Sequence, residues 1–105
     1  MKKIATGIAL AALAATAAQA ADRPLNNAAI ANALAGKTVQ MGGGFANFGK
    51  DRSYNFSGLF YGKWRATNRS VCVSFQTGGA TCSKVVHDGK NVVIVDAQKN
   101  RFLVK

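Results

Sequence analysis

Acidic residues are scarce in this chain, and none of them is Glu. The 105 residues contain four Asp against 14 Lys and Arg, which gives a formal net charge of +10 at pH 7. Glycoside hydrolysis ordinarily needs two carboxylates that face each other across one site. Apart from the early Asp22, the available carboxylates are Asp51, Asp88 and Asp96, and each falls in an apparent turn. The sequence therefore offers no carboxylate pair for acid–base chemistry.

Histidine is almost absent. His87 is the only one, and because it stands beside Asp88 in an expected hairpin turn, we interpret it as a solvated turn residue. A zinc site needs three or four protein ligands, and a serine nucleophile needs a histidine as its base. We therefore expect no metal, no cofactor and no catalytic residue, and we predict that the protein is not an enzyme.

Long hydrophobic runs are absent beyond the first residues of the chain. The one run, after Met1-Lys2-Lys3, is Ala-rich and shorter than the about 20 apolar residues that a membrane-spanning helix needs. It ends at Ala18-Gln19-Ala20, a small-x-small pattern typical of a signal-peptidase site. We predict that residues 1–20 are a signal peptide cleaved near Ala20/Ala21. Residues 21–105 then form a single domain, periplasmic or secreted, with no transmembrane segment.

Cysteine is limited to one pair, Cys72 and Cys82. Their spacing excludes the Cys-x-x-Cys arrangement of redox-active pairs. In a small exported domain, an even number of cysteines most simply forms structural disulfides. We predict a Cys72–Cys82 bridge, which in the chain-entropy model stabilises the folded chain by about 2–3 kcal/mol.

The spacing of apolar residues changes at Gly36. Residues 25–35 are rich in Ala, with Asn26 or Asn27 as a cap and Gly36 at the end, and they predict a short helix. Beyond Gly36 the apolar residues follow a period of two, which predicts strands. These strands are expected at residues 38–41, 54–56, 59–61, 63–67, 71–75, 81–86, 92–95 and 102–104.

Between these strands we expect a loop or short strand at residues 45–51, a kink or bulge at Gly58, and several turns. Asp88-Gly89, flanked by apolar runs, is the strongest hairpin signal. Many short strands with turns between them favour a mainly β fold, a small antiparallel meander curled into a sheet or barrel. We expect one short N-terminal helix, after the signal peptide, to pack on this sheet.

The two cysteines set a register for the strands around them. A three-residue loop at residues 76–78 places Cys72 opposite Cys82, where two strand residues can be bridged. Continuing through the preceding turn places Arg65 opposite Cys72. Since strand residues alternate between faces, the bridge shares its face with cations, and Trp64 lies on the opposite face, which we expect to form the core.

The candidate binding face consists of three cations that share the face of the disulfide and one from the neighbouring turn: Lys63, Arg65, Arg69 and Lys84. The same register places Val93 and Val95 on this face, so either the helix covers part of it or the register slips. Two of the 14 basic residues belong to the predicted signal, which leaves 12 against four Asp, a net charge of +8, for residues 21–105. Such an excess favours anionic partners.

Many of the aromatic residues lie between residues 45 and 64, interleaved with Lys and Arg. Such a pattern can stack on and neutralise single-stranded nucleic acid. We favour the alternative that these rings form the core of a small barrel, and nucleic acid is therefore the less favoured partner. The rings concerned are Phe45, Phe48, Tyr54, Phe56, Phe60, Tyr61 and Trp64.

Short motifs in a fixed order give one resemblance. Leu34-Ala35-Gly36-Lys37-Thr38-Val39 is followed by Gly62-Lys63-Trp64, then by Cys72 and Cys82 with glycines between them, and then by Asp88-Gly89. In this order the motifs resemble those of a group of small exported proteobacterial proteins of unknown function, except that Lys63 stands where that group usually has Thr. The resemblance implies a compact, β-rich, disulfide-bearing envelope domain, and it implies no catalytic residue.

We therefore predict a non-enzymatic exported domain that binds an anionic envelope component or protein through its basic face. The partners that fit are an anionic glycan, lipopolysaccharide or an acidic protein. The alternative is a small periplasmic inhibitor of a lysozyme or protease, a class that this chain resembles in size and architecture only. A hydrolase is the third candidate.

Overall fold

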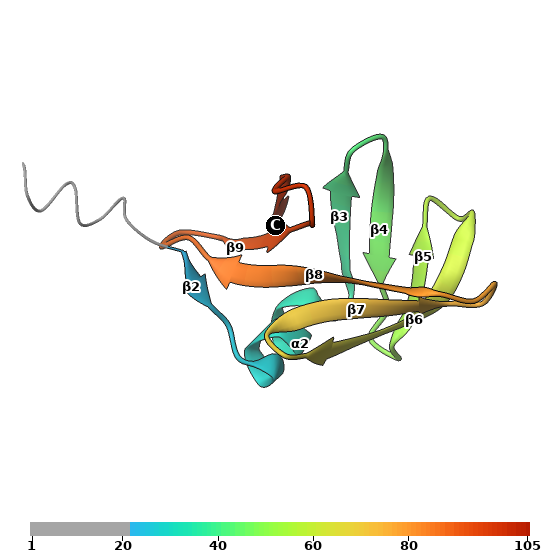
Figure 1. The fold of residues 1–105 in the computed structure, drawn as a ribbon, viewed down its shortest axis with the longest axis horizontal. Helices are drawn as coiled ribbons and strands as arrows, with labels where there is room; N and C mark the ends of the chain where they lie inside the picture. Colours follow the sequence, from blue (N-terminus) through green and yellow to red (C-terminus); the bar gives the residue numbers. More distant parts are fainter. Residues whose placement is uncertain (1–21) are drawn as a thin grey trace, which may run out of the picture.

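Nine strands and one helix make up most of residues 22–105, the part of the chain that the computed structural model describes (Figure 1). The predicted signal peptide lies outside these residues. In chain order the elements are β2 (Arg23–Pro24), α2 (Asn27–Leu34), β3 (Lys37–Met41), β4 (Gly44–Phe48), β5 (Ser53–Phe56), β6 (Phe60–Thr67), β7 (Ser70–Phe75), β8 (Ala80–His87), β9 (Val92–Val95) and β10 (Arg101–Val104).

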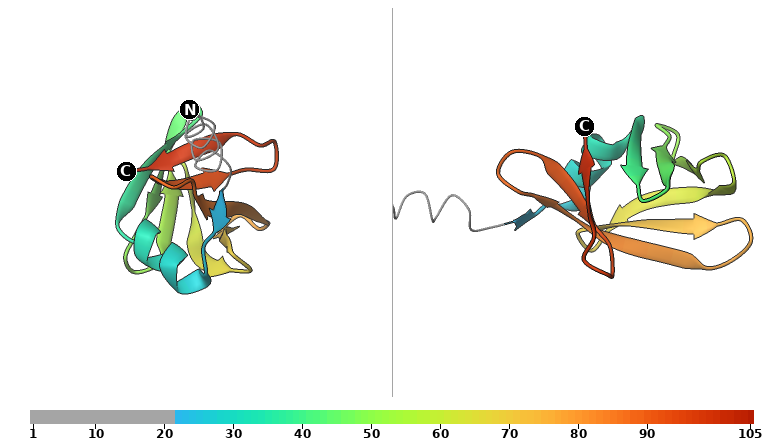
Figure 2. Two further views of the ribbon diagram at one scale, coloured as in Figure 1. Left: turned by 90° about the vertical axis from the view of Figure 1, so that its left-hand side faces the viewer. Right: turned by 90° about the horizontal axis from the view of Figure 1, so that it is seen from above.

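The strands form one antiparallel meander that nearly closes into a barrel. Strands β3 to β10 pair in sequence order, each with the next, and β2 pairs with the end of β8. The outermost strands of this series, β3 and β10, lie side by side, and Lys37 Nζ donates to the Lys105 carbonyl at 3.2 Å. Seen along the long axis, the strands curl around the interior (Figure 2). The prediction of a mainly β, barrel-like meander is confirmed.

Helix α2 begins at a cap that the sequence indicates. The Asn26 side chain accepts a hydrogen bond from the Ala29 amide at 2.8 Å, and Gly36 takes φ +79° just beyond the last turn. Ile30 and Leu34 are fully buried where the helix packs against β6 and β7. The helix is not the first element of the described residues, however, because β2 precedes it and pairs with β8. A two-residue strand is too short for any periodicity to reveal.

The chain around Gly58 differs from its predicted form. Gly58 lies in the turn of the β5–β6 hairpin with φ +68°, rather than in a kinked strand, and Phe56 pairs with Phe60 across it. Glycine tolerates this left-handed conformation at no steric cost, so the chain reverses there. The segment for which both a loop and a strand were expected contains β4, because Ala46 and Phe48 point into the core while β3 and β5 pair with its two edges.

Aromatic rings form much of the core. Trp64 is 2% exposed and meets Phe48 edge-on with ring centroids 5.6 Å apart, and Phe48 packs in the same way on Tyr54 at 5.3 Å. Trp64 Nε1 donates to the Gly49 carbonyl at 2.9 Å, so the polar atom of the buried indole has a partner. The Arg52 guanidinium lies 4.4 Å from the centroid of the same ring. The predicted burial of Trp64 is confirmed.

The core interpretation of the aromatic residues is correct only in part. The buried rings are Phe48, Tyr54 and Trp64, Phe56 is half-buried, and the exposed rings are Phe45, Phe60 and Tyr61. The exposed rings lie in or beside the β3–β4 and β5–β6 turns, where the hairpins extend beyond the core. Periodicity within a strand does not reveal where that strand leaves the core.

Of the two valines that the register places on the outer face, Val93 is buried without the helix and without a register slip, whereas Val95 is half-buried. Val93 lies opposite Val86 on β8 and Leu103 on β10, and Pro24 of β2 lies opposite Val86. These four apolar residues form one row across neighbouring strands, in which Val93 is 1% and Val86 8% exposed. Packing between strand neighbours therefore covers this part of the outer face.

Candidate anion-binding site

The disulfide lies within the predicted basic face. Cys72 and Cys82 are directly opposite each other on β7 and β8 and are bonded, which confirms the predicted bridge. Arg65 is opposite Cys72, and its guanidinium donates to Ser74 Oγ at 3.2 Å. Lys63 is opposite Ser74 on the same face. These two cations of β6 are both exposed.

The other two predicted cations lie further along the sheet. Lys84 is opposite Val95 on β9, and Arg69 occupies the β6–β7 turn with φ +58°. The Arg69 amide donates to the Asn27 side chain at 3.0 Å, which ties the turn to the start of helix α2. Arg69 and Lys84 line one cavity, whereas the two cations of β6 lie outside it.

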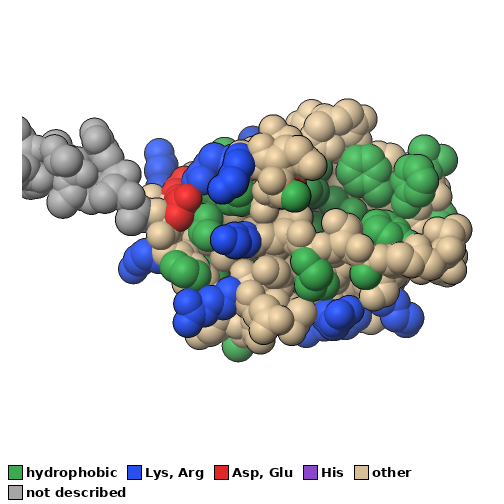
Figure 3. Space-filling model, viewed as in Figure 1, with side chains coloured by type: hydrophobic (Ala, Val, Ile, Leu, Met, Phe, Trp, Pro, Cys, Tyr) green, Lys and Arg blue, Asp and Glu red, His purple; other side chains and the backbone are tan. Residues whose placement is uncertain are grey.

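This cavity, of about 690 Å³, is lined by four cations, and we name it the basic cleft. Besides Arg69 and Lys84, its cations are Lys99 from the β9–β10 turn and Arg101 from β10. The remaining lining residues are Asp22, Pro24, Asn68, Val85, Val86 and Val95. A smaller hollow of about 330 Å³ adjoins it and shares Lys84, Val95 and Lys99. Figure 3 shows Lys and Arg side chains gathered around an acidic one near the start of the described chain.

The one carboxylate that lines the basic cleft already has a partner. Arg101 donates to both oxygens of Asp22, at 2.7 and 3.0 Å. The hydrogen bond from Arg101 holds the pKa of Asp22 below its ordinary value, against a smaller opposing effect of desolvation. Within residues 22–105 this is the only ion pair. Arg69, Lys84 and Lys99 therefore line the cleft with no carboxylate partner among the described residues.

The β9–β10 turn positions Lys99 beside the cleft. Asp96 accepts hydrogen bonds from the amides of Gln98 and Asn100 at 3.0 and 2.8 Å, and the Lys99 amide donates to the Asp96 carbonyl at 3.0 Å. These bonds close the turn, in which Lys99 takes φ +71°. The carboxylate of Asp96 is used within its own loop, where it accepts hydrogen bonds from backbone amides and from the Asn100 side chain rather than from a cation of the cleft.

Lys99 and Arg101 are absent from the residues that the sequence predicts for the site. Arg101 is opposite Val95, which is itself opposite Lys84, so the three residues share the outer face. Extending the predicted register by one further hairpin is enough to find Arg101. Lys99 lies in a turn, to which no strand register applies, and only the folded loop brings it to the cleft.

His87 ends strand β8 instead of lying in the turn that follows. It is paired with Val92 on β9 and with Arg23 on β2, and its Nδ1 accepts a hydrogen bond from the Gly89 amide at 3.0 Å. Its interpretation as a turn residue is wrong, because pairing on both edges extends β8 to this position. Asp88 does lie in the turn, where backbone amides donate to its carboxylate. Across residues 22–105, His, Cys and acidic side chains form no cluster of three or more that could hold a metal ion.

Comparisons with protein-family models, with curated proteins and with solved structures give no match to this chain. None of the helical structure in residues 22–105 is long and apolar enough to cross a membrane.

Proposed function

We propose that the protein is exported and binds an anionic polymer of the cell envelope, an acidic glycan or lipopolysaccharide, in its basic cleft, without catalysing a reaction. The observation that carries this proposal is the lining of the cleft, where Arg69, Lys84 and Lys99 have no carboxylate partner among the described residues. A cleft lined by charge of one sign focuses the electric field and raises the local concentration of counter-ions. Such a lining favours an anionic ligand.

The chemistry of the cleft suits charged groups on a larger body. Guanidinium and ammonium groups donate charge-assisted hydrogen bonds to phosphate and carboxylate oxygens. Between the cations, the apolar side chains of Pro24 and Val95 offer surface to the uncharged part of a ligand. The volume of about 690 Å³ falls within the range of about 300–1,000 Å³ that is usual for small-molecule sites. A charged sugar unit fits these dimensions.

Further cations extend the positive surface along β6. Lys63 and Arg65 share the outer face with Lys84 and Arg101 but lie outside the cleft. A polymer with repeated anionic groups can contact both regions at once. The disulfide suits an oxidising compartment, and the resemblance to exported proteobacterial proteins supports the same location.

Titration of the purified protein with heparin, lipopolysaccharide, a single-stranded oligonucleotide and lysozyme, each at low and high salt, tests the proposal. We expect binding to the polyanions that weakens steeply as salt is added, since salt screens exposed charges. Salt-resistant binding to lysozyme alone would support the inhibitor alternative instead. Binding to none of these probes would contradict both functions.

Charge-reversal variants locate the site. Lys84→Glu and Arg69→Glu are each expected to weaken polyanion binding about tenfold, a loss of about 1.4 kcal/mol. Lys90→Glu, in the exposed β8–β9 turn, changes the net charge equally and is the control. Charge reversal at Lys63 and Arg65 should weaken binding of long polymers and barely move the melting temperature, because both side chains are exposed. Equal losses in every variant, the control included, would mean that net charge attracts the polymer without a defined cleft.

A further inference from the structure

Three hairpin tips lie together at the end of the barrel away from the β6–β7 turn, and none of them contains a charged residue. They are the tips of β3–β4, β5–β6 and β7–β8, residues 41–45, 56–61 and 75–80, which we name the apolar end. The Ser57 amide donates to the Phe45 carbonyl at 2.8 Å, and the Gln76 amide donates to the Tyr61 carbonyl at 2.9 Å. Neighbouring tips are therefore hydrogen-bonded into one surface.

Large apolar side chains are exposed on this surface. Leu59 is 73%, Phe60 58%, Phe45 50% and Tyr61 49% exposed. Single exposed apolar residues are ordinary in proteins, but a contiguous group of them marks a place of contact with another molecule or a membrane. These four exposed residues lie on two hydrogen-bonded hairpin tips, β3–β4 and β5–β6, and therefore form a contiguous group.

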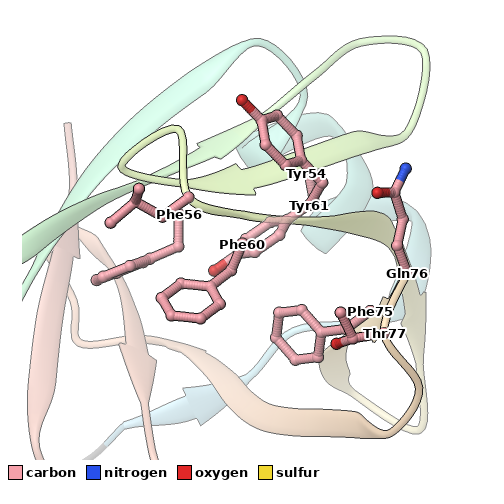
Figure 4. Close-up of a pocket in the computed structure, with 8 residues that line it drawn as sticks. Tyr54, Phe56, Phe60, Tyr61, Phe75, Gln76 and Thr77 are labelled. Carbon is pink, nitrogen blue, oxygen red and sulfur yellow. The ribbon is translucent and has the colours of Figure 1, made fainter.

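A hollow of about 440 Å³ lies beside these residues, and no charged side chain lines it. Rings from three strands line it, and Gln76 adds a polar side chain at the edge (Figure 4). The rings are those of Tyr54, Phe56, Phe60, Tyr61 and Phe75. An uncharged, ring-lined hollow of this kind accepts apolar chains rather than ionised groups. The ligand chemistry at this end is therefore different from that of the basic cleft.

Strand β6 connects the apolar end to cations at spacings set by strand geometry. Since strand residues alternate between faces, Tyr61, Lys63 and Arg65 share the outer face of β6. At about 3.3 Å per residue, the two cations follow Tyr61 at about 7 and 13 Å. In the opposite direction along the chain, Leu59 and Phe60 precede Tyr61 and lie at the tip. Along one direction the chain therefore presents apolar, aromatic and then cationic side chains.

We propose that the apolar end inserts into the interfacial layer of an anionic lipid bilayer. Peripheral proteins bury apolar side chains about 5–10 Å into the boundary between headgroups and acyl chains, and three residues, about 10 Å of strand, separate Phe60 from Lys63. Leu59 and Phe60 enter the acyl region, and Tyr61 lies at the headgroup level that tyrosine favours. Lys63 and Arg65 contact lipid phosphates, so charge complementarity selects an anionic membrane.

A second copy of this chain suits the apolar end less well. Two apolar ends placed tip to tip bring Lys63 and Arg65 of both copies to one junction, where like charges repel. An anionic bilayer carries the opposite charge. The basic cleft lies toward the other end of β6, beside the turn that contains Arg69, and it stays free when the tips are inserted. The inference therefore does not rest on the proposed function.

Vesicle sedimentation tests the inference, using the protein recovered after export and its variants in the same form. One set of vesicles contains equal parts of phosphatidylglycerol and phosphatidylcholine, and the other contains phosphatidylcholine alone. We expect binding to the first set, weakened about tenfold or more by Leu59→Ser combined with Phe60→Ser, and far less by Lys84→Glu. Failure to bind the anionic vesicles would overturn the proposal. So would a result in which Lys84→Glu loses binding while the double variant Leu59→Ser with Phe60→Ser keeps it.

A fluorescent reporter measures insertion directly. Leu59→Trp places an indole at the tip, whereas Trp64 is 2% exposed in the core. Lipids brominated on their acyl chains should quench Leu59→Trp and leave the emission of the parent protein nearly unchanged. Sedimented protein without this quenching would overturn insertion. A concentration-dependent dimer that Leu59→Ser dissociates, detected by analytical ultracentrifugation, would assign the apolar end to a second copy instead.

Discussion

Trp64 is the largest fully buried side chain among the described residues, and three kinds of contact meet there. Its ring packs on Phe48, its Nε1 donates to the Gly49 carbonyl, and the Arg52 guanidinium lies over it. We expect Trp64→Ala to lower the free energy of unfolding by about 3–5 kcal/mol, because it removes a large side chain from the core. Urea unfolding followed by circular dichroism measures this loss.

Trp64→Phe separates the packing of this ring from its hydrogen bond. It keeps an aromatic ring in the core but leaves the Gly49 carbonyl without its donor, so we expect a smaller loss, about 1–3 kcal/mol. Heparin binding should be unchanged in both variants wherever they are folded. A Trp64→Ala protein that kept its stability and lost binding would make Trp64 a ligand contact and invert the assignment of the two faces.

Asp22 should make anion binding depend on pH. Its pKa lies below the ordinary value of 3.8, mainly because Arg101 donates to it. A carboxylate whose pKa is lower in the folded than in the unfolded chain stabilises the fold at pH values above its unfolded-state pKa. This stabilisation is lost as the pH falls through the folded-state pKa. Protonation at acid pH releases Arg101, so affinity for a sulfated polymer such as heparin should rise below pH 3.8.

Substitution reproduces the same effect at neutral pH. Asp22→Asn is expected to strengthen heparin binding and flatten its pH dependence, as measured by isothermal titration calorimetry. Asp51→Asn is the matched control, because the pKa of Asp51 is also lowered, but by a hydrogen bond from Ser53 outside the cleft. Equal gains in the two variants would show that overall charge, rather than release of Arg101, governs binding.

At the scale of elements, strands β6 and β7 leave no room for a side chain at Gly62. An added Cβ would overlap the Ser74 carbonyl oxygen and lie 3.1 Å from Phe75 Cα, both of them backbone atoms. The two strands would have to separate, so we expect Gly62→Ala to lower the free energy of unfolding by about 1–3 kcal/mol. Gly43→Ala is the control, since nothing lies within 4 Å of a Cβ there. Thermal unfolding of both variants should show a lower midpoint for the first alone.

The disulfide between β7 and β8 stabilises the folded protein by lowering the conformational entropy of the unfolded chain. Cys72 and Cys82 are 10 residues apart, and closing a loop of this size contributes about 2–3 kcal/mol in the chain-entropy model. Adding a reductant should lower the urea midpoint, and the free energy of unfolding derived from it should fall by the same amount, about 2–3 kcal/mol. The double variant Cys72→Ala with Cys82→Ala should show the same loss. Heparin binding by the folded protein should be unaffected. An unchanged midpoint after complete reduction would contradict this account.

For the whole molecule, we predict that cleavage of the signal peptide determines where the mature chain begins. Asp22 is bonded to Arg101 in the basic cleft, so cleavage near Ala20/Ala21 leaves the start of the processed chain beside the proposed site. We expect mass spectrometry of the exported protein to find a chain that begins at or next to Ala21. Full-length protein confined to the cytoplasm would contradict both the signal peptide and the envelope function.

Features that depend on neighbouring residues were determined by the sequence itself. Asn26 caps the helix because its side chain reaches an amide three residues away, and Asp88-Gly89 turns the chain between two apolar runs. The pairing of Cys72 with Cys82 fixed the local register, and strand alternation then placed Trp64 in the core. Each of these inferences needs only the geometry of one helix end or one hairpin.

Only the tertiary structure decided which cations share a site and which rings stay exposed. Lys99 reaches the basic cleft through the conformation of its turn, and Asp22 meets Arg101 across almost the whole described chain. Phe60 and Tyr61 are exposed because the β5–β6 hairpin extends past the core. Barrel curvature sets these relations, bringing β10 beside β3. That curvature results from the packing of all the strands together, so no local pattern in the sequence specifies it.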